Sequence, residues 1–345
     1  MPTIRYVLIG LGNLGRRFCE IVQEKDADLR QRYDVDLRLV GAADSRGAAY
    51  DLQGLDLADV VRLKTSGESI AAYPAIGKTG WEAKALIEAA EADVMLEASP
   101  VNLPQHAEPG LSCIRTALEK GWHVITPNKG PLVVAYQELH ALARSHGVKL
   151  RYDGTVAGGL PALNIGRRDM RGAIIHRIEA VPNLVTGYVV DMLSNGLTWD
   201  TALARARAEG VLESDAAWDL EGWDAAAKLT ILANTVLDYP AQIEDVTRAG
   251  ITGLAQEELV SACDRNFCYR LLARAERRAD GGYNLSVAPV ALGPDHPLGR
   301  LGSKQLGIVF HTDIYGTLTT IIEEPDPIPS AATMLRDLLD IYTED

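Results

Sequence analysis

The chain has 345 residues, of which 47% are apolar, and a formal net charge of -13. This length supplies enough apolar material for a large core, which we expect to be divided between two domains. The negative charge argues against nucleic acid or an anionic membrane as partner, because both are bound by basic surfaces. No stretch reaches the roughly 18 apolar residues of a membrane span, and the first residues lack the apolar core of a signal peptide. We therefore expect a soluble, cytoplasmic protein.

The cysteines and histidines give no sign of a transition-metal site. The seven histidines include no H-x-x-x-H pair, and no two cysteines have C-x-x-C spacing. Four cysteines in so long a chain are more simply interpreted as reduced residues of the core. They are Cys19, Cys113, Cys263 and Cys268.

The N-terminal segment has the pattern of a dinucleotide-binding turn. An apolar run at residues 6–9 predicts a strand, a GxGxxG sequence follows it at once, and a helical pattern comes next. The glycines permit a tight turn and close approach of a pyrophosphate, while the helix N-terminus offers free N–H groups. A purely structural glycine turn is the alternative, but the position after a strand favours a cofactor site. Its predicted contacts are Gly10, Gly12, Asn13, Leu14 and Gly15.

A second strand, predicted at residues 37–43, ends at Asp44, Ser45 and Arg46. An acid at this place binds the ribose 2′-hydroxyl of NAD, whereas an arginine meets the 2′-phosphate of NADP. The two signs conflict. We expect Asp44, Ser45 and Arg46 to contact the cofactor, and we favour NAD.

Further strands alternate with helices and predict a parallel, doubly wound sheet. A strand from residue 94 leads to Ala98, Ser99 and Pro100, a helix spans 109–119, and another strand spans 122–126. Ligands of such sheets lie at the carboxyl ends of the strands. Ala98, Ser99 and Pro100 are therefore predicted cofactor contacts. Lys129 is a candidate for a role at the nicotinamide, and a surface charge is the alternative.

A second candidate is the pair Asp224 and Lys228, near the start of a predicted helix. Residues four apart share one helix face, and an acid placed N-terminal to a lysine is the favourable order. A solvated ion pair is the ordinary alternative for such spacing. In the functional interpretation, the two side chains hold a polar substrate.

Four segments together resemble the homoserine dehydrogenases of the short form, which lack a C-terminal regulatory domain. They are the GxGxxG turn and residues 126–132, 155–161 and 213–228. The resemblance implies a Rossmann-type dinucleotide-binding domain at residues 1–150, with a returning helix at 329–345. It implies a second α+β domain at 151–328, which binds the substrate and carries the contact of a homodimer. The implied reaction interconverts L-homoserine and L-aspartate 4-semialdehyde with NAD or NADP.

The resemblance also implies residue roles. Lys129 and Lys228 would serve proton transfer, and Glu213 and Asp224 would bind the ammonium group of the substrate. The chemistry agrees, because alcohol oxidation by a nicotinamide needs a proton acceptor and no protein nucleophile or metal. The family's monovalent cation site would fall on four residues, with an aspartate where a glutamate is usual; a capped turn between domains is the alternative. These residues are Asp153, Val156, Gly158 and Leu160.

The chain departs from the family pattern in two segments. Residues 183–187, Asn-Leu-Val-Thr-Gly, lack three polar or glycine positions of the family's substrate motif, and residues 323–329 replace a glycine-rich segment. A dehydrogenase of another small hydroxy compound, or a nicotinamide-binding sensor that has lost catalysis, therefore stays open at this point.

The remaining second half predicts a mixed domain. Residues 174–180 and 184–190 are expected as strands or strand-to-helix segments, and 201–208 as a helix capped by Thr198. Residues 308–312 and 318–322 are predicted late strands, followed by a final helix at 331–342.

Overall fold

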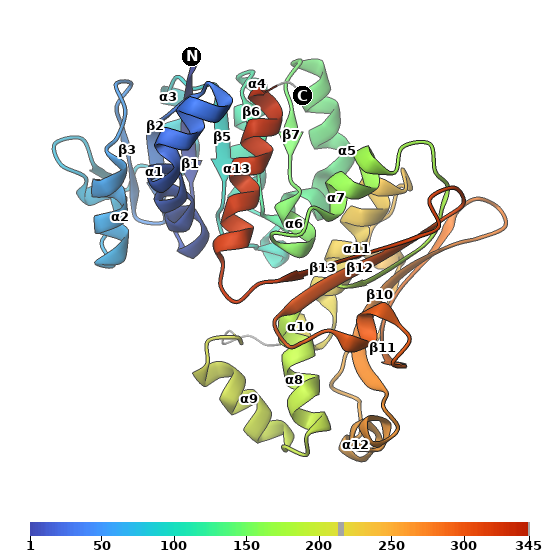
Figure 1. Ribbon diagram of the computed structural model, residues 1–345. Coiled ribbons are helices and arrows are strands. Elements are labelled where there is room, and N and C mark those ends of the chain that lie inside the picture. The colour runs from blue at the N-terminus through green and yellow to red at the C-terminus, as the bar shows by residue number, and fades with distance from the viewer. Residues whose placement is uncertain (213–216, 344–345) are drawn as a thin grey trace. The chain divides into compact units, whose positions relative to one another are not determined.

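A computed structural model of the chain describes residues 1–212 and 217–343 (Figure 1). The chain divides into two compact units, one formed by residues 1–159 and 326–345 and the other by residues 160–325. Among the described residues, no helix is long and apolar enough to cross a membrane.

The first unit is built on a seven-stranded sheet of order β4-β3-β2-β1-β5-β6-β7. Five of its strands are parallel, which confirms the predicted doubly wound sheet, while β3 and β4 add an unpredicted antiparallel edge. The strands are β1 (Thr3–Ile9), β2 (Asp36–Asp44), β3 (Gly47–Tyr50), β4 (Lys78–Thr79), β5 (Val94–Glu97), β6 (His123–Ile125) and β7 (Leu150–Arg151).

Helices connect these strands and cover the sheet. Tyr6 and Leu8 of β1 are fully buried under Phe18 of α1 and Met334 of α13, so the last helix of the chain completes the core of the first unit (Figure 1). This helix begins at Ile328, three residues before the predicted start. The helices are α1 (Asn13–Tyr33), α2 (Leu57–Thr65), α3 (Ala83–Ala89), α4 (Gly110–Glu119), α5 (Lys129–Ser145), α6 (Gly154–Ala157) and α13 (Ile328–Tyr342).

The second unit holds a six-stranded sheet of order β13-β12-β8-β10-β11-β9. Its neighbouring strands are antiparallel except for the parallel pair β11 and β9. The late strands at the end of the chain are confirmed, whereas the long hairpin of β10 and β11 was not predicted. The strands are β8 (Ile175–Val181), β9 (Val246–Arg248), β10 (Cys268–Arg277), β11 (Tyr283–Leu292), β12 (Gln305–Thr312) and β13 (Thr317–Glu323).

Helices α8 and α11 pack against β10 of this sheet. Residues 184–190, for which a strand was one alternative, belong entirely to helix α8, because Asn183 caps the helix by accepting a hydrogen bond from the Thr186 N–H. Thr198 caps α9 as predicted. The helices are α7 (Ala162–Asn164), α8 (Leu184–Ser194), α9 (Trp199–Ala208), α10 (Ala217–Leu220), α11 (Trp223–Val236) and α12 (Gln256–Asp264).

Candidate active site

The glycine turn after β1 has the geometry of a pyrophosphate cradle. A Cβ on Gly10 would lie 2.4 Å from the Ala98 carbonyl, and one on Gly15 would lie 2.0 Å from the Gly10 oxygen, so neither position admits a side chain. A Cβ on Gly12 would meet no described atom within 4 Å. Gly12 gives α1 no side-chain cap, so no capping side chain competes with an anion for the first N–H groups of the helix.

Asp44 ends β2 and is held by four donors from its own unit. Lys64 donates to its carboxylate at 2.6 Å, and Ser69 and the Ile70 N–H donate at 2.7 and 2.9 Å. The Arg46 N–H donates at 3.0 Å. Burial alone would raise the pKa of Asp44, but the bonds from Lys64 and the backbone lower it to about 2. The carboxylate is therefore ionised and fixed beside the nucleotide turn.

Glu97, at the end of β5, is hydrogen-bonded to the loop that follows β5 and to the loop that follows β6. Its carboxylate accepts from the Ser99 N–H at 2.9 Å and from the Thr126 hydroxyl at 2.9 Å. Thr126 in turn accepts from the Asn128 N–H, and Asn128 caps α5 by accepting from Gly130. Glu97 is fully buried, and burial raises its pKa, which the hydrogen bonds offset only in part.

Lys129 is the first residue of α5 and is half-buried. It directly follows the capping residue Asn128, so its backbone is fixed by the hydrogen bonds that run from Glu97 through Thr126. The position past a parallel strand is the one that the sequence predicted for a group at the nicotinamide.

Asp224 and Lys228 of α11 form an ion pair in the second unit, with Nζ and Oδ2 2.8 Å apart. The two side chains are 5% and 16% exposed, so the alternative of a solvated surface pair is excluded. Lys228 also donates to the Pro182 carbonyl at 2.6 Å. An ammonium has three donors. The described acceptors of Lys228 occupy two of them, which leaves one direction for a substrate oxygen.

Asn183 joins this pair to a further acid, Asp219. Its side-chain amide donates to Asp219 at 2.6 Å and to Asp224 at 2.7 Å, while its oxygen caps α8. Helix α11 begins only at Trp223, because Gly222 adopts a left-handed conformation with φ of 82° and separates it from α10. Two carboxylates and one ammonium give the described cluster a net charge of -1, which suits a cationic substrate group.

Three of the four predicted sodium ligands already have hydrogen-bond partners in the protein. Asp153 is 3% exposed, and its carboxylate accepts a hydrogen bond from the Arg336 guanidinium at 2.5 Å. The Gly158 carbonyl accepts from Thr333 and the Leu160 carbonyl from the Ala162 N–H. Burial and the neighbouring Asp153 raise the pKa of Asp337 to about 8, so this acid adds little negative charge at neutral pH. Residues 154–157 form helix α6 rather than an open turn.

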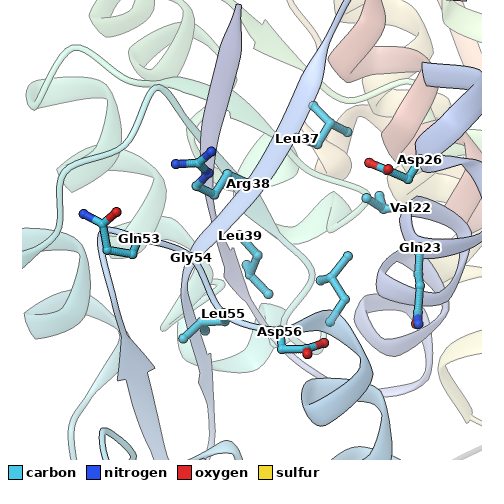
Figure 2. Close-up of a pocket in the computed structure, with 11 residues that line it drawn as sticks. Val22, Gln23, Asp26, Leu37, Arg38, Leu39, Gln53, Gly54, Leu55 and Asp56 are labelled. Carbon is cyan, nitrogen blue, oxygen red and sulfur yellow. The ribbon is translucent and has the colours of Figure 1, made fainter. Parts of the chain in front are cut away.

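The first unit contains a pocket of about 500 Å³ (Figure 2). It is lined by Leu37 to Leu39 at the start of β2, by the middle of α1 and by residues 53–57. Leu37 pairs with Ile4, at the amino end of β1, whereas the glycine turn follows the carboxyl end. The pocket is therefore not the nucleotide site.

Comparison with known proteins agrees with this geometry. A model of the NAD-binding domain of homoserine dehydrogenase matches residues 10–153, and a homoserine dehydrogenase model matches residues 161–339. The chain belongs to the homoserine dehydrogenase family. The predicted resemblance and enzyme class, an NAD(P)-dependent oxidoreductase, are thereby confirmed, and a non-catalytic sensor is not favoured.

Individual relatives match along nearly the whole chain. An NAD(+)-dependent homoserine dehydrogenase of Pseudomonas canavaninivorans is 32% identical over 99% of this chain and 97% of its own length. A homoserine dehydrogenase of Methanocaldococcus jannaschii is 32% identical over 97% of this chain and 98% of its own. A solved hyperthermophilic archaeal homoserine dehydrogenase in complex with NADPH has a TM-score of 0.84 and 26% identity, covering 99% and 98% of the two chains.

The structure brings together some of the predicted homoserine dehydrogenase residues and adds others. Gly10 to Gly15, Asp44 and Ala98 to Pro100 gather around the ends of β1, β2 and β5, where Gly10 donates to Ala43 and Ala98 to Ile9. Glu213 lies outside the described residues. Glu97, Asp219 and the bridging amide of Asn183 were not predicted. The one sequence signal for Asn183 was its position as the retained first residue of the altered family motif.

Proposed function

We propose that the chain interconverts L-homoserine and L-aspartate 4-semialdehyde by hydride transfer to or from a nicotinamide. The observation that carries this proposal is the partly buried cluster of Asn183, Asp219, Asp224 and Lys228, which combines a fixed ammonium with two carboxylates. An amino acid alcohol needs both features: an acidic site for its ammonium group, and a proton-transfer group at its hydroxyl.

In the reducing direction, hydride moves from the cofactor to the aldehyde carbon, and the aldehyde oxygen takes a proton. Lys228 can donate that proton, because Asp224 and the Pro182 carbonyl hold two of its three N–H groups in fixed directions. In the oxidising direction the neutral amine accepts the proton from the hydroxyl while hydride leaves for the nicotinamide. Lys129 is proposed to assist at the cofactor side, from its fixed place at the start of α5.

Asp219 and Asp224 are proposed to bind the substrate ammonium together with Glu213. Asn183 donates to both described carboxylates and so fixes their positions relative to one another. The altered loop at 183–187 then retains the residue that organises the acids, which supports homoserine over a hydroxy compound without an ammonium group.

The nicotinamide cofactor is proposed to be NAD in preference to NADP. Asp44 ends β2, at the place where an acid binds the ribose 2′-hydroxyl of NAD, and the Arg46 guanidinium, which could meet a 2′-phosphate, donates instead to the Gly67 carbonyl at 2.9 Å. The Lys64 ammonium is paired with the Asp44 carboxylate at 2.6 Å. The expected result for Asp44→Ala is a larger loss of kcat/KM with NAD+ than with NADP+, and equal losses would refute a ribose contact.

The second unit is proposed to bind the substrate and to form a homodimer. Apolar side chains are exposed at the edge strand β13 and the turn before it, at Ile314, Tyr315, Leu318 and Ile321. An apolar edge of this kind is stabilised by association. Light scattering of the purified protein should give the mass of two chains, and a monomer that persists at micromolar concentration would contradict the proposal. The cytoplasmic location stays a prediction.

The direct test is turnover by the purified chain with homoserine and each cofactor, measured by the absorbance of the reduced nicotinamide. Homoserine-dependent formation of NADH at a higher kcat/KM than that of NADPH is the expected result. Absence of turnover with homoserine, alongside turnover of an alcohol without an ammonium group, would overturn the proposed substrate.

A further inference from the structure

Arg336 of α13 contacts the segment on which the resemblance to the family would place a monovalent cation site. Its Nη2 lies 2.5 Å from the Asp153 carboxylate, and its Nη1 donates to the Gly159 carbonyl at 3.2 Å. Nη2 also lies 3.4 Å from the Thr333 hydroxyl, which itself donates to the Gly158 carbonyl at 2.9 Å. One guanidinium thus binds the Asp153 carboxylate and the Gly159 carbonyl directly, and it is linked to the Gly158 carbonyl through the Thr333 hydroxyl.

These acceptors are of the kind that a sodium ion selects. A hard monovalent cation binds carboxylate and carbonyl oxygens, and a guanidinium offers the same single positive charge with directed N–H donors. Because Asp153 is buried and already paired with Arg336, a second cation beside it would meet like-charge repulsion. Arg336 is two-thirds buried, so it is part of the packed unit rather than a mobile surface group.

The contact of Arg336 with Asp153 and Gly159 joins two segments of the first unit that lie far apart in the sequence. Asp153 lies two residues after β7, and Gly159 is the last residue before the chain leaves the first unit. Helix α13 belongs to the segment that returns to that unit. The guanidinium therefore links residues 153–159 to helix α13, and both segments belong to the first unit.

We propose that Arg336 is an internal cation that replaces a bound monovalent metal ion at Asp153. The stability of the chain then does not depend on sodium or potassium. The rate of turnover does not depend on these ions either, and this part of the proposal rests on the proposed function.

The test compares the melting temperature of the full chain in sodium, potassium and choline chloride at equal ionic strength. Choline is too large for a carboxylate and carbonyl site, so it controls for ionic screening. The wild-type melting temperature is expected to agree among the three salts. Arg336→Met should lower it by about 5 °C or more, because a buried carboxylate loses its partner, and Arg336→Lys should lie between the two. A melting temperature of Arg336→Met that rises with sodium but not with choline would support the equivalence of the two cations.

Arg115→Met is the matched control, since Arg115 and Glu138 form an exposed bidentate pair in the same unit. Its melting temperature should stay near that of the wild type. A wild-type melting temperature that rises with sodium but not choline would overturn the proposal, and so would Arg336→Met as stable as Arg115→Met. Because melting needs no substrate, a wild type that is inactive on homoserine would refute the proposed function alone.

Discussion

Replacement of Asn183 should separate its role as a helix cap from its role between two carboxylates. The side-chain oxygen caps α8, and the amide nitrogen donates to Asp219 and Asp224 at 2.6 and 2.7 Å. Asn183→Asp preserves the size and the capping oxygen but puts a third carboxylate where the donors were. Asn183→Ser preserves a capping hydroxyl that is too short to serve both acids.

The magnitude follows from the bonds that are lost. A hydrogen bond to an ionised group contributes about 1.5–3 kcal/mol, and about 1.4 kcal/mol corresponds to a tenfold change in rate. If Asn183→Ser loses the equivalent of one such bond in the transition state, kcat/KM for homoserine falls about 10- to 100-fold. Asn183→Asp should fall further, because three carboxylates repel one another, and should recover in part at lower pH, where a proton takes the place of the amide hydrogen.

Steady-state kinetics with homoserine, with cofactor affinity measured separately, provide the assay. Both variants should bind the cofactor as the wild type does, and thermal melting of Asn183→Ser should show a folded protein. The reasoning is refuted if Asn183→Asp retains kcat/KM within about threefold of the wild type at neutral pH, since that is under 1 kcal/mol.

Two further predictions concern the first unit. Glu97→Gln should both raise KM for the cofactor and lower kcat. An amide accepts more weakly than a carboxylate from Ser99 and Thr126, so the backbone before Lys129 is held less firmly. An unchanged KM would count against a role of Glu97 in positioning the cofactor loops. Asp44→Asn should lower the free energy of unfolding at pH 7 by about 2 kcal/mol, because the folded pKa lies nearly two units below the ordinary value and each unit corresponds to about 1.4 kcal/mol. That contribution is present above pH 4 and lost as pH falls toward 2, so denaturation curves of the two proteins should converge there; a difference that stays constant with pH would contradict the assignment.

The first unit was largely predictable because its signals are local. A strand, a glycine turn and a helix succeed one another within residues 3–33, and the same alternation continues to β7. The site residues at strand ends follow from the rule that parallel sheets bind ligands there. The antiparallel edge of β3 and β4 was missed because β4 has only two residues.

The second unit was less predictable because its patterns conflict with its structure. Strand β10 has the sequence CYRLLARAER, rich in leucine, alanine and arginine, which favour helices in isolation; it forms a strand through pairing with β8 and β11. The contacts of Asn183 with Asp219 and Asp224 span 36 and 41 residues, and that of Arg336 with Asp153 spans 183. No local pattern reports pairs so far apart along the chain.

The central claim is that Lys228 transfers the proton that accompanies hydride transfer to or from homoserine. Its most direct test is kcat for homoserine oxidation by Lys228→Met, alongside the affinity for the nicotinamide cofactor. A general acid or base contributes about 10²- to 10⁴-fold, so kcat should fall at least about 100-fold while cofactor affinity is unchanged. A variant whose kcat stays within about threefold of the wild type would contradict the claim and reduce the Asp224 and Lys228 pair to a structural contact.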